Sequence, residues 1–290
     1  MSIVVTGATG HLGRLAVESL IQRGVAPADI VAAGRNVERL QEFAGLGVNI
    51  AAIDYSDPAS LTAAFEGADT LVLVSGSEVG KRVEQHANAI NAAKAAGVSR
   101  IVYTSAPHAD TTSLILAPEH KATEELISAS GIPFTILRNG WYTENYAQTV
   151  EQAGQSGVII ASVGQGRVAS ASRADYAEAI AAVLTTPGHE NSVYELSGDE
   201  AWTHDDLAAA AARILGRDVV YTPLSADEHL ATLTAVGLPA ETAGFIVALD
   251  ANIADGLLGE TSGDLARLIG HPTTPLEDGL RDALAMPASV

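Results

Sequence analysis

The sequence predicts an α/β protein with a doubly wound parallel sheet and a smaller C-terminal α/β lobe. Three observations support this prediction. Short apolar runs alternate with helical patterns over the first half of the chain, a glycine-rich turn joins the first run to the first helical pattern, and the alternation loosens after Gly140. Strands separated by helices in this rhythm indicate a parallel sheet that helices cover on both faces.

The glycine-rich turn directly follows the first apolar run. It reads Thr6-Gly7-Ala8-Thr9-Gly10-His11-Leu12-Gly13, and a helical pattern begins after it. Gly7 suits a tight turn, Gly10 lets main chain approach a phosphate without a Cβ, and Gly13 allows the helix to pack closely on the strand. The helix N–H groups and the positive end of the helix dipole favour an anion. The turn therefore predicts the pyrophosphate site of a Rossmann-type dinucleotide-binding domain.

Further apolar runs extend the predicted sheet. Together with residues 2–5, they are residues 30–33, 48–53, 70–74, 100–104 and 134–137. Because crossovers in such sheets are nearly always right-handed, the carboxyl ends of the strands meet at one edge, outside which ligands bind. The residues that follow each strand are therefore the candidate ligand contacts. Each could equally be ordinary turn chemistry, since Gly, Asn, Ser and Asp favour loops.

Beyond Gly140 the pattern predicts a second, smaller unit. Residues 158–160 and 193–196 suit short strands, and residues 173–184 and 204–215 suit helices, followed by an Ala- and Leu-rich tail. Thr203 suits the N-cap of the second of these helices, with acidic residues in its first turn. We predict a dinucleotide-binding domain over residues 1–140, open to later strands, and a substrate lobe over residues 141–290.

The composition excludes several kinds of chemistry. The chain has no cysteine, which rules out disulfides, thiolate nucleophiles, thiolate zinc sites and cysteine-ligated iron–sulfur clusters. A formal charge of −19 without a run of Lys and Arg argues against nucleic-acid binding. The scattered positions of His108, Glu119 and His120 predict no metal site. Neither a membrane span nor an export signal is recognisable, so we expect a cytoplasmic protein with no membrane partner.

The end of the second strand predicts which cofactor binds. In NAD sites an acidic residue there binds the ribose 2′-hydroxyl, whereas a basic residue accommodates the 2′-phosphate of NADP. Here the strand ends in Gly34-Arg35-Asn36, and the planar Arg35 predicts NADPH, with NADH as the alternative. Arg35 could instead stack on adenine or pair with a surface acid. We expect His11 beside the same phosphate.

Two turns farther along the edge extend the predicted cofactor site. Asp54 suits an acceptor for the adenine amino group, and equally suits an ordinary turn aspartate. Ser75-Gly76-Ser77 is expected near the ribose on the nicotinamide side.

The usual catalytic pair of short-chain dehydrogenases is missing. In that pair, Tyr-x-x-x-Lys, the lysine lowers the pKa of the tyrosine so that it protonates an alkoxide. No tyrosine here has a lysine four residues later, and the corresponding positions are Leu116 and His120. A quinone or a carbocationic dye delocalises the added charge and depends less on an acid. The absence therefore favours conjugated, electron-poor acceptors, with His120 as a candidate hydrogen-bonding group.

Several motifs together resemble a known family, and the resemblance spans nearly the whole chain. They are the glycine-rich turn, Arg35-Asn36-Val37-Glu38, His120 with Ala122-Thr123-Glu124, Leu137-Arg138-Asn139-Gly140 with Tyr142, and His189-Glu190-Asn191 with Tyr194 and Trp202-Thr203. The chain resembles an atypical short-chain dehydrogenase of the NmrA-like group, close to NAD(P)H:quinone oxidoreductases and triphenylmethane reductases.

The resemblance implies which residues contact the cofactor. They are Gly7, Thr9, Gly10, His11, Leu12, Gly13, Arg35, Ser75, Gly76, Ser77, Asn139, Gly140, Trp141, Tyr142 and Glu144. It also implies that Asn139 and Tyr142 border the nicotinamide, which makes Tyr142 a second catalytic candidate, and that Trp141 or Tyr142 stacks on a flat acceptor. The alternative is that these aromatics are core residues under the second lobe.

Two functions from different classes fit these observations. The first is an NADPH-dependent reductase of quinones or similar conjugated acceptors. The second is an NmrA-like NADP redox sensor that acts through a protein partner without catalysis. A sugar-nucleotide epimerase fits less well, because such enzymes also resemble the Tyr-Lys type. The sequence leaves open the physiological acceptor, any proton donor and the oligomeric state, a homodimer included.

Overall fold

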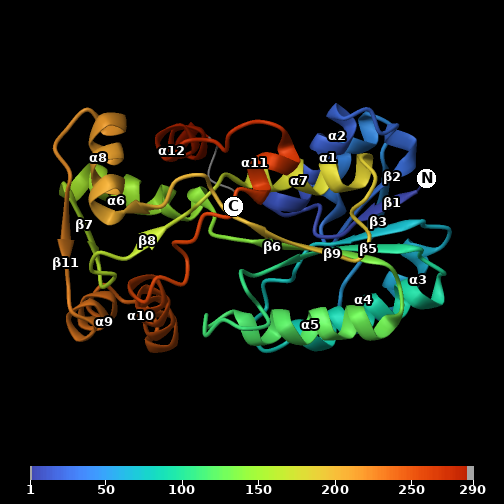
Figure 1. Ribbon diagram of the computed structural model, residues 1–290, viewed down its shortest axis with the longest axis horizontal. Helices are drawn as coiled ribbons and strands as arrows, with labels where there is room; N and C mark the ends of the chain where they lie inside the picture. The colour runs from blue at the N-terminus through green and yellow to red at the C-terminus, as the bar shows by residue number, and fades with distance from the viewer. Residues whose placement is uncertain (1, 286–290) are drawn as a thin grey trace.

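Seven parallel strands form the main sheet of the protein. The computed structural model describes residues 2–285, and its strands lie in the order β3-β2-β1-β4-β5-β6-β9 (Figure 1). The strands are β1 Ile3–Val5, β2 Ile30–Gly34, β3 Asn49–Ala52, β4 Thr70–Leu73, β5 Arg100–Ser105, β6 Phe134–Asn139 and β9 Ser192–Leu196. The predicted doubly wound α/β fold is confirmed. The strand order reverses between β1 and β4, which places the ligand crevice outside their carboxyl ends.

Helices cover both faces of this sheet, as Figure 1 shows. One face carries α1 His11–Gln22, α2 Gln41–Gly45, α7 Arg173–Thr185 and α11 Asp264–Ile269, and the other carries α3 Pro58–Phe65, α4 Arg82–Ala95 and α5 Ala117–Ser130. Successive side chains of a strand point to opposite faces. Ile3 and Val5 accordingly join the core under α1 and α7, whereas Val4 joins the core under α3, α4 and α5. Both cores hold the strand ends of the site in place.

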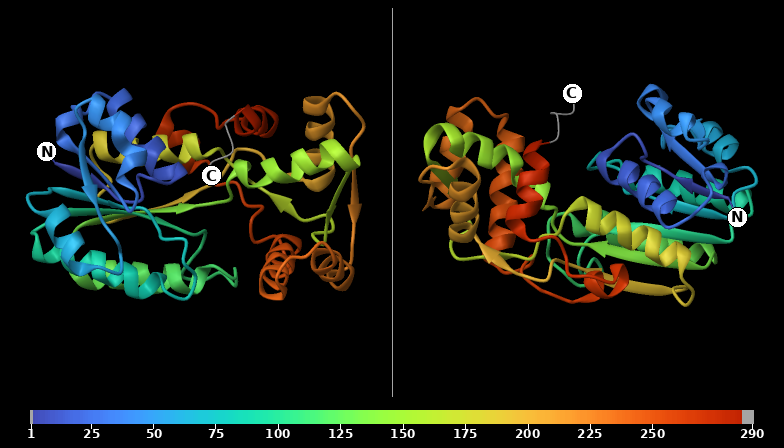
Figure 2. Two further views of the ribbon diagram at one scale, coloured as in Figure 1. Left: turned by 180° about the vertical axis from the view of Figure 1, so that it is seen from behind. Right: turned by 90° about the horizontal axis from the view of Figure 1, so that it is seen from above.

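The smaller lobe has its own core and lies beyond the carboxyl ends of the strands of the main sheet (Figures 1 and 2). Its elements are η3 Thr143–Tyr146, α6 Ala147–Ser156, β7 Val158–Ala161, β8 Arg167–Val168, β10 Trp202–Thr203, α8 His204–Leu215, β11 Val220–Pro223, α9 Ala226–Ala235, α10 Ala240–Ala254 and α12 Leu276–Ala285. Trp202, Leu207 and Ile253 are among its buried residues. The predicted cap is confirmed, because the Thr203 side chain accepts a hydrogen bond from the main-chain N–H of Asp206.

The chain returns to the main sheet after Gly140. Strand β9 pairs with β6 as the last strand of the sheet, α7 packs on α1, and α11 packs on α7 and β9. The predicted strand at residues 193–196 therefore belongs to the main sheet, and the predicted strand at residues 158–160 belongs to the smaller lobe. The smaller lobe is thus built from segments of the chain that alternate with parts of the large one.

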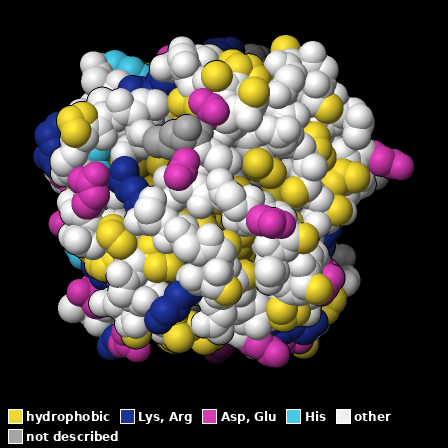
Figure 3. Space-filling model, turned by 90° about the vertical axis from the view of Figure 1, so that its right-hand side faces the viewer, with side chains coloured by type: hydrophobic (Ala, Val, Ile, Leu, Met, Phe, Trp, Pro, Cys, Tyr) yellow, Lys and Arg dark blue, Asp and Glu magenta, His cyan; other side chains and the backbone are white. Residues whose placement is uncertain are grey.

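The surface of the described chain carries both signs of charge. Figure 3 shows one face, on which acidic and basic side chains are interspersed among hydrophobic ones. Within residues 2–285, no helix combines the length and the apolar character that crossing a bilayer requires.

Candidate cofactor and acceptor site

A cavity of about 490 Å³ lies at the carboxyl edge of the main sheet, where the smaller lobe meets it. All but one of the predicted site residues line it. These are Gly7, Thr9, Gly10, His11, Leu12, Gly13, Arg35, Asp54, Ser75, Gly76, Ser77, His120, Asn139, Gly140, Trp141 and Tyr142. Glu144 is not among the lining residues. The topology therefore brings together side chains and turns from five strand ends and the start of α5.

The glycine-rich turn has the geometry of a phosphate cradle. Gly7 has a positive φ of 63°, and its carbonyl accepts a 2.9 Å hydrogen bond from the N–H of Gly10. A Cβ on Gly13 would lie 2.3 Å from the carbonyl oxygen of Gly7, so only glycine fits there. Helix α1 begins at His11 without a side-chain cap. Its first N–H groups thus remain available for an anion, and a diphosphate fits the turn.

Positive charge gathers beside this turn. Burial, together with the charges of Arg173 and Arg39, lowers the pKa of His11. The guanidinium of Arg173, at the start of α7, lies 4.7 Å from the centre of the Tyr142 ring and donates a 2.9 Å hydrogen bond to Asn145. Arg173 and Asn145 both line the cavity. Neither was predicted. Asn145 lies one residue beyond the predicted residues 139–144, whereas Arg173 comes from a distant segment that only the return of the chain to the main sheet places here.

Arg35 and Asp54 combine features of both interpretations made from the sequence. Arg35 lines the cavity and also forms an ion pair with Glu78, with Nη1 and Oε1 3.1 Å apart. Asp54 lines the cavity and also caps its own turn, since its Oδ1 accepts a 2.8 Å hydrogen bond from the N–H of Ser56. Contact of either residue with a cofactor stays a prediction.

The turn after β4 is held by a partly buried network of hydrogen bonds. The N–H of Gly76 donates to Nε2 of His86 at 3.0 Å, and its carbonyl accepts from Nε of Arg82 at 2.7 Å. Arg82 in turn pairs with Glu119 at 2.7 Å, and His86 contacts Thr123 at 2.9 Å. The two consecutive basic residues Lys81 and Arg82 thus differ in environment. Arg82 is buried in this network, whereas Lys81 is exposed.

His120 is a neutral base against the cavity. It lies on α5, with Nδ1 2.8 Å from the hydroxyl of the buried Tyr103. Burial, with a contribution from the charge of Arg82, lowers the pKa of His120 to about 3. Leu116, at the position of the usual tyrosine, also lines the cavity. The neutral imidazole can exchange a hydrogen bond with a ligand but cannot replace the fixed charge of a lysine.

Asn139 and Tyr142 form another part of the cavity wall. Nδ2 of Asn139 donates a 3.4 Å hydrogen bond to the Tyr142 hydroxyl, and its buried Oδ1 has no hydrogen-bond partner within the described residues. An unpaired buried acceptor next to a cavity suits a ligand amide. Burial raises the pKa of Tyr142, so its hydroxyl stays protonated at neutral pH. Glu144 instead accepts a 2.8 Å hydrogen bond from the N–H of Arg173, and its contact with a cofactor stays a prediction.

The remaining wall of the cavity is apolar. It is formed by Ala106, Pro107, Leu114, Leu116, Trp141 and Leu258. Trp141 is half-buried and packs against the core of the smaller lobe, so it belongs both to that core and to the cavity. The sequence does not indicate Leu258. This residue follows α10, and only the folding of the chain brings it to the cavity. A flat, conjugated molecule suits such a wall.

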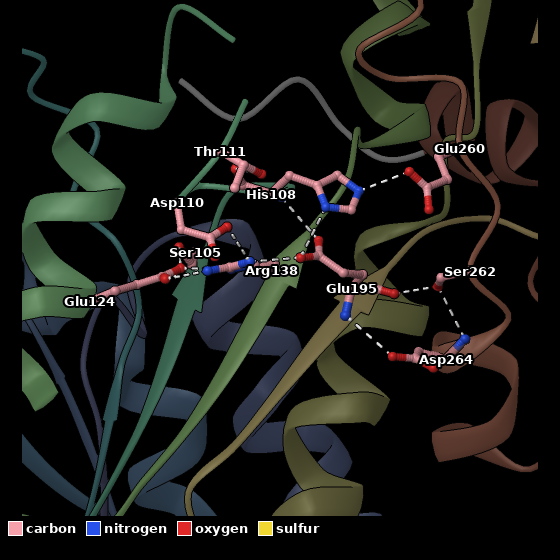
Figure 4. A network of polar contacts seen from close by, with 10 residues as sticks. All are labelled: Ser105, His108, Asp110, Thr111, Glu124, Arg138, Glu195, Glu260, Ser262 and Asp264. Carbon is pink, nitrogen blue, oxygen red and sulfur yellow. Dashed lines mark hydrogen bonds and ion pairs between the residues drawn. The ribbon is translucent and has the colours of Figure 1, made fainter. Parts of the chain in front are cut away.

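Arg138 contacts Asp110 in the loop between β5 and α5 (Figure 4), and this loop supplies part of the apolar wall. The guanidinium forms a paired contact with the buried Glu124 through bonds of 3.0 and 2.6 Å, and it also reaches Asp110 and Glu195, each at 2.8 Å. Burial opposes the charge of Arg138, but the bonds to Glu124 and Glu195 raise its pKa. His108 lies between Glu195 and Glu260 of the smaller lobe, 2.9 Å from the latter. The network thus joins the loop after β5 and the strands β6 and β9 to the segment that connects α10 with α11.

A family model described as NAD(P)H-binding matches residues 7–187. The chain belongs to this NAD(P)H-binding family. It is 48% identical over 278 residues to quinone oxidoreductase 2 of Escherichia coli, and the aligned residues cover 96% of this chain and 97% of the relative. It is 28% identical over 294 residues to an NmrA-like family oxidoreductase, flvB, of Aspergillus flavus, with 98% and 95% covered. The predicted resemblance to the NmrA-like group is confirmed.

Solved structures agree with this membership. The NADPH-dependent quinone oxidoreductase QOR2 of Escherichia coli, in complex with NADPH, superposes with a TM-score of 0.92 at 48% identity and covers 97% of this chain and 99% of its own. Triphenylmethane reductase of Citrobacter sp., in complex with NADP(H), also reaches a TM-score of 0.92 at 39% identity, with 98% and 100% covered. The likeness extends over both lobes and therefore over the whole cavity.

Proposed function

We propose that this protein is an NADPH-dependent reductase that transfers hydride to quinones or similar conjugated, electron-poor acceptors. One observation supports the proposal above all. A phosphate cradle and an apolar wall share one cavity, and Leu116 and His120 stand where a Tyr-Lys pair would be. Such a site binds a dinucleotide beside a flat molecule and offers little acid for a hard alkoxide.

The names of the relatives point to the same class of acceptor. The Escherichia coli protein is named for quinones and the Citrobacter protein for triphenylmethane dyes, and both kinds of compound are conjugated. Each accepts a hydride into a delocalised system. The absence of a Tyr-Lys pair from the sequence is consistent with that chemistry.

The residues of the cavity divide the work of holding the cofactor. Residues 7–13 would hold the diphosphate, Arg35 the 2′-phosphate, and Asn139 the nicotinamide amide. NADPH, when bound, supplies the hydride. The protein itself makes two contributions. The fixed main chain of Gly76 helps to orient the two reactants, and the apolar wall excludes water from them.

His120 and Tyr142 act as neutral hydrogen-bonding groups in this proposal. Burial keeps His120 uncharged and Tyr142 protonated at neutral pH, so neither holds a charge against the acceptor. A neutral donor can stabilise the oxygen of a quinone as charge develops on it. The anion that results from hydride transfer would then take its proton from solvent after it leaves the cavity.

The redox sensor is not favoured as an alternative. Its sequence evidence was the missing Tyr-Lys pair, which fits a reductase of conjugated acceptors equally well. A further argument against it is the open apolar wall, which leaves room for an acceptor. Cytoplasmic localisation, the absence of a nucleic-acid partner and a homodimer stay predictions.

Steady-state oxidation of NADPH tests the proposal. The purified protein is mixed with a panel of quinones and cationic dyes, and the loss of nicotinamide absorbance is followed. We expect turnover with several conjugated acceptors and none with simple aliphatic ketones. Binding of NADPH without turnover of any conjugated acceptor would contradict the reductase and favour the sensor.

A further inference from the structure

The guanidinium expected to select the cofactor is already in contact with a carboxylate. Oε1 of Glu78 lies 3.1 Å from Nη1 of Arg35, and Oε2 of the same carboxylate lies 3.4 Å from Nζ of Lys81. Arg35 and Glu78 both line the cavity. All three side chains are more than one-third exposed, with Glu78 at 38%. A 2′-phosphate that approached Arg35 would therefore meet Glu78 at the same guanidinium.

The main chain holds Glu78 at this place. On one side, His86 and Arg82 fix both polar atoms of the Gly76 peptide. On the other side, the N–H of Gly80 donates a 2.8 Å hydrogen bond to Glu119. Only residues 77–79 lie between these two anchors. These two anchors hold the main chain of Glu78 beside the cavity, and its exposed side chain can rotate.

We propose that Glu78 is a specificity-determining residue that lowers the affinity for 2′-phosphorylated dinucleotides. Its carboxylate competes with the 2′-phosphate for Arg35 and repels the phosphate, whereas a 2′-hydroxyl meets neither effect. Lys81 moderates the competition because it draws the same carboxylate away from Arg35. The inference rests on the proposed binding of NADPH and adds that the affinity is set by two opposing charges at one site.

Solvent exposure determines how large the effect is. Exposed ion pairs are weak because water screens them, so a dianionic phosphate displaces Glu78 from Arg35 readily. The repulsion that remains acts over a short distance in a largely aqueous medium. We therefore expect Glu78 to change the affinity for NADPH by about 3- to 10-fold and to leave NADH binding unaffected.

Titration calorimetry of Glu78→Gln and Glu78→Ala tests the proposal. The ligands are NADPH and NADH, together with 2′,5′-ADP and 5′-AMP, which isolate the adenosine half of the cofactor. We expect both variants to bind NADPH and 2′,5′-ADP about 3- to 10-fold more tightly than the parent, and NADH and 5′-AMP equally well. The gain is expected to shrink as ionic strength rises. A gain in affinity cannot arise from misfolding.

A second variant tests the role of Lys81. Lys81→Met is expected to weaken NADPH binding in the parent and to have a much smaller effect in the Glu78→Gln background, because Lys81 acts through Glu78. An equal loss in both backgrounds would show instead that Lys81 acts on the phosphate directly, which would overturn this part of the inference.

Glu66→Gln is the matched control. It makes the same change in net charge, but the exposed Glu66 caps the end of α3, at the opposite edge of the sheet. We expect no change in NADPH binding. Unchanged or weaker NADPH binding in Glu78→Gln, or an equal gain in Glu66→Gln, would overturn the inference. Failure of the parent to bind NADPH would overturn the proposed function itself.

Discussion

Nε2 of His86 accepts a 3.0 Å hydrogen bond from the main-chain N–H of Gly76. Because a peptide N–H can only donate, the imidazole is neutral and its proton is on Nδ1, 2.9 Å from Thr123. Burial, with smaller contributions from His120 and Arg82, lowers the pKa of His86 to about 3. Protonation would break the bond that positions the turn after β4. The neutral state of His86 and the shape of the cofactor site are thus coupled.

This coupling predicts how stability depends on pH. His86 and His120 both have a pKa of about 3 in the folded protein, against 6.5 for an ordinary histidine. The unfolded chain therefore binds more protons between these values, and the free energy of unfolding falls as the pH falls from 6.5 toward 3. Each histidine contributes up to about 1.4 kcal/mol per pH unit in this window.

Urea unfolding at a series of pH values measures this slope. His86→Gln removes one of the two titrating groups, and we expect its stability to depend less steeply on pH than that of the parent. His271→Gln is a suitable control, because His271 is exposed and its pKa is raised by the Pro272 carbonyl and Glu178. Parallel slopes for His86→Gln and the parent would argue against a neutral, buried His86.

The packing of Gly13 predicts a large effect of one methyl group. In Gly13→Ala the new Cβ would lie 2.3 Å from the carbonyl oxygen of Gly7, so the turn or the helix must shift. We expect a loss of stability of about 1–3 kcal/mol and loss of dinucleotide binding. Thermal unfolding and calorimetry measure the two effects.

Gly244→Ala provides the comparison for this substitution. Gly244 lies within α10, and a Cβ there meets no atom within 4 Å. Alanine in an open helical position is expected to stabilise the protein by about 0.5–1 kcal/mol, without effect on binding. Equal behaviour of the two variants would show that the close approach of Gly13 and Gly7 is unimportant.

The position of Arg35 predicts a switch in cofactor preference. Arg35→Asp removes a charge-assisted contact and adds repulsion, so we expect NADPH binding to weaken by roughly 2–4 kcal/mol, and NADH binding far less. Calorimetry with both cofactors measures the difference. Arg23→Asp makes the same change in charge at the far end of α1 and is expected to be neutral. An unchanged ratio of affinities in Arg35→Asp would show that another residue selects the cofactor.

His120 is expected to affect turnover more than cofactor binding. In His120→Asn the hydrogen bond to an acceptor oxygen is weakened, and we expect kcat with quinones to fall by about tenfold or less, since one neutral hydrogen bond is involved. The dissociation constant of NADPH should stay within about twofold of the parent. Tyr103→Phe removes the partner of Nδ1 and should reproduce part of the loss. A fall in NADPH affinity with unchanged kcat would contradict this role.

Much of the site could be predicted because main-chain geometry is local. The turn at residues 7–13 contains three glycines whose roles follow from steric rules, and the strand ends follow from periodicity, so the carboxyl edge and most of its turns were identified correctly. Arg173 and Leu258 were missed for the opposite reason. Nothing near either residue in sequence indicates that α7 or the segment after α10 reaches the cavity.

Charge states were also beyond local inference. A lone His120 or Arg82 looks the same in sequence whether it is solvated or buried. Their states depend on desolvation and on partners such as Tyr103 and Glu119, which folding brings near. The same holds for Glu78, whose contact with Arg35 joins the ends of two different strands.

The order of residues alone determined the doubly wound sheet, the phosphate turn and the lack of a Tyr-Lys pair, because each depends on neighbours a few positions apart. Tertiary structure decided which side chains share the cavity, how the smaller lobe closes it, and which ionisable groups are charged. These properties depend on distances between segments far apart in the chain and on the removal of water around them, and neither is encoded by local spacing.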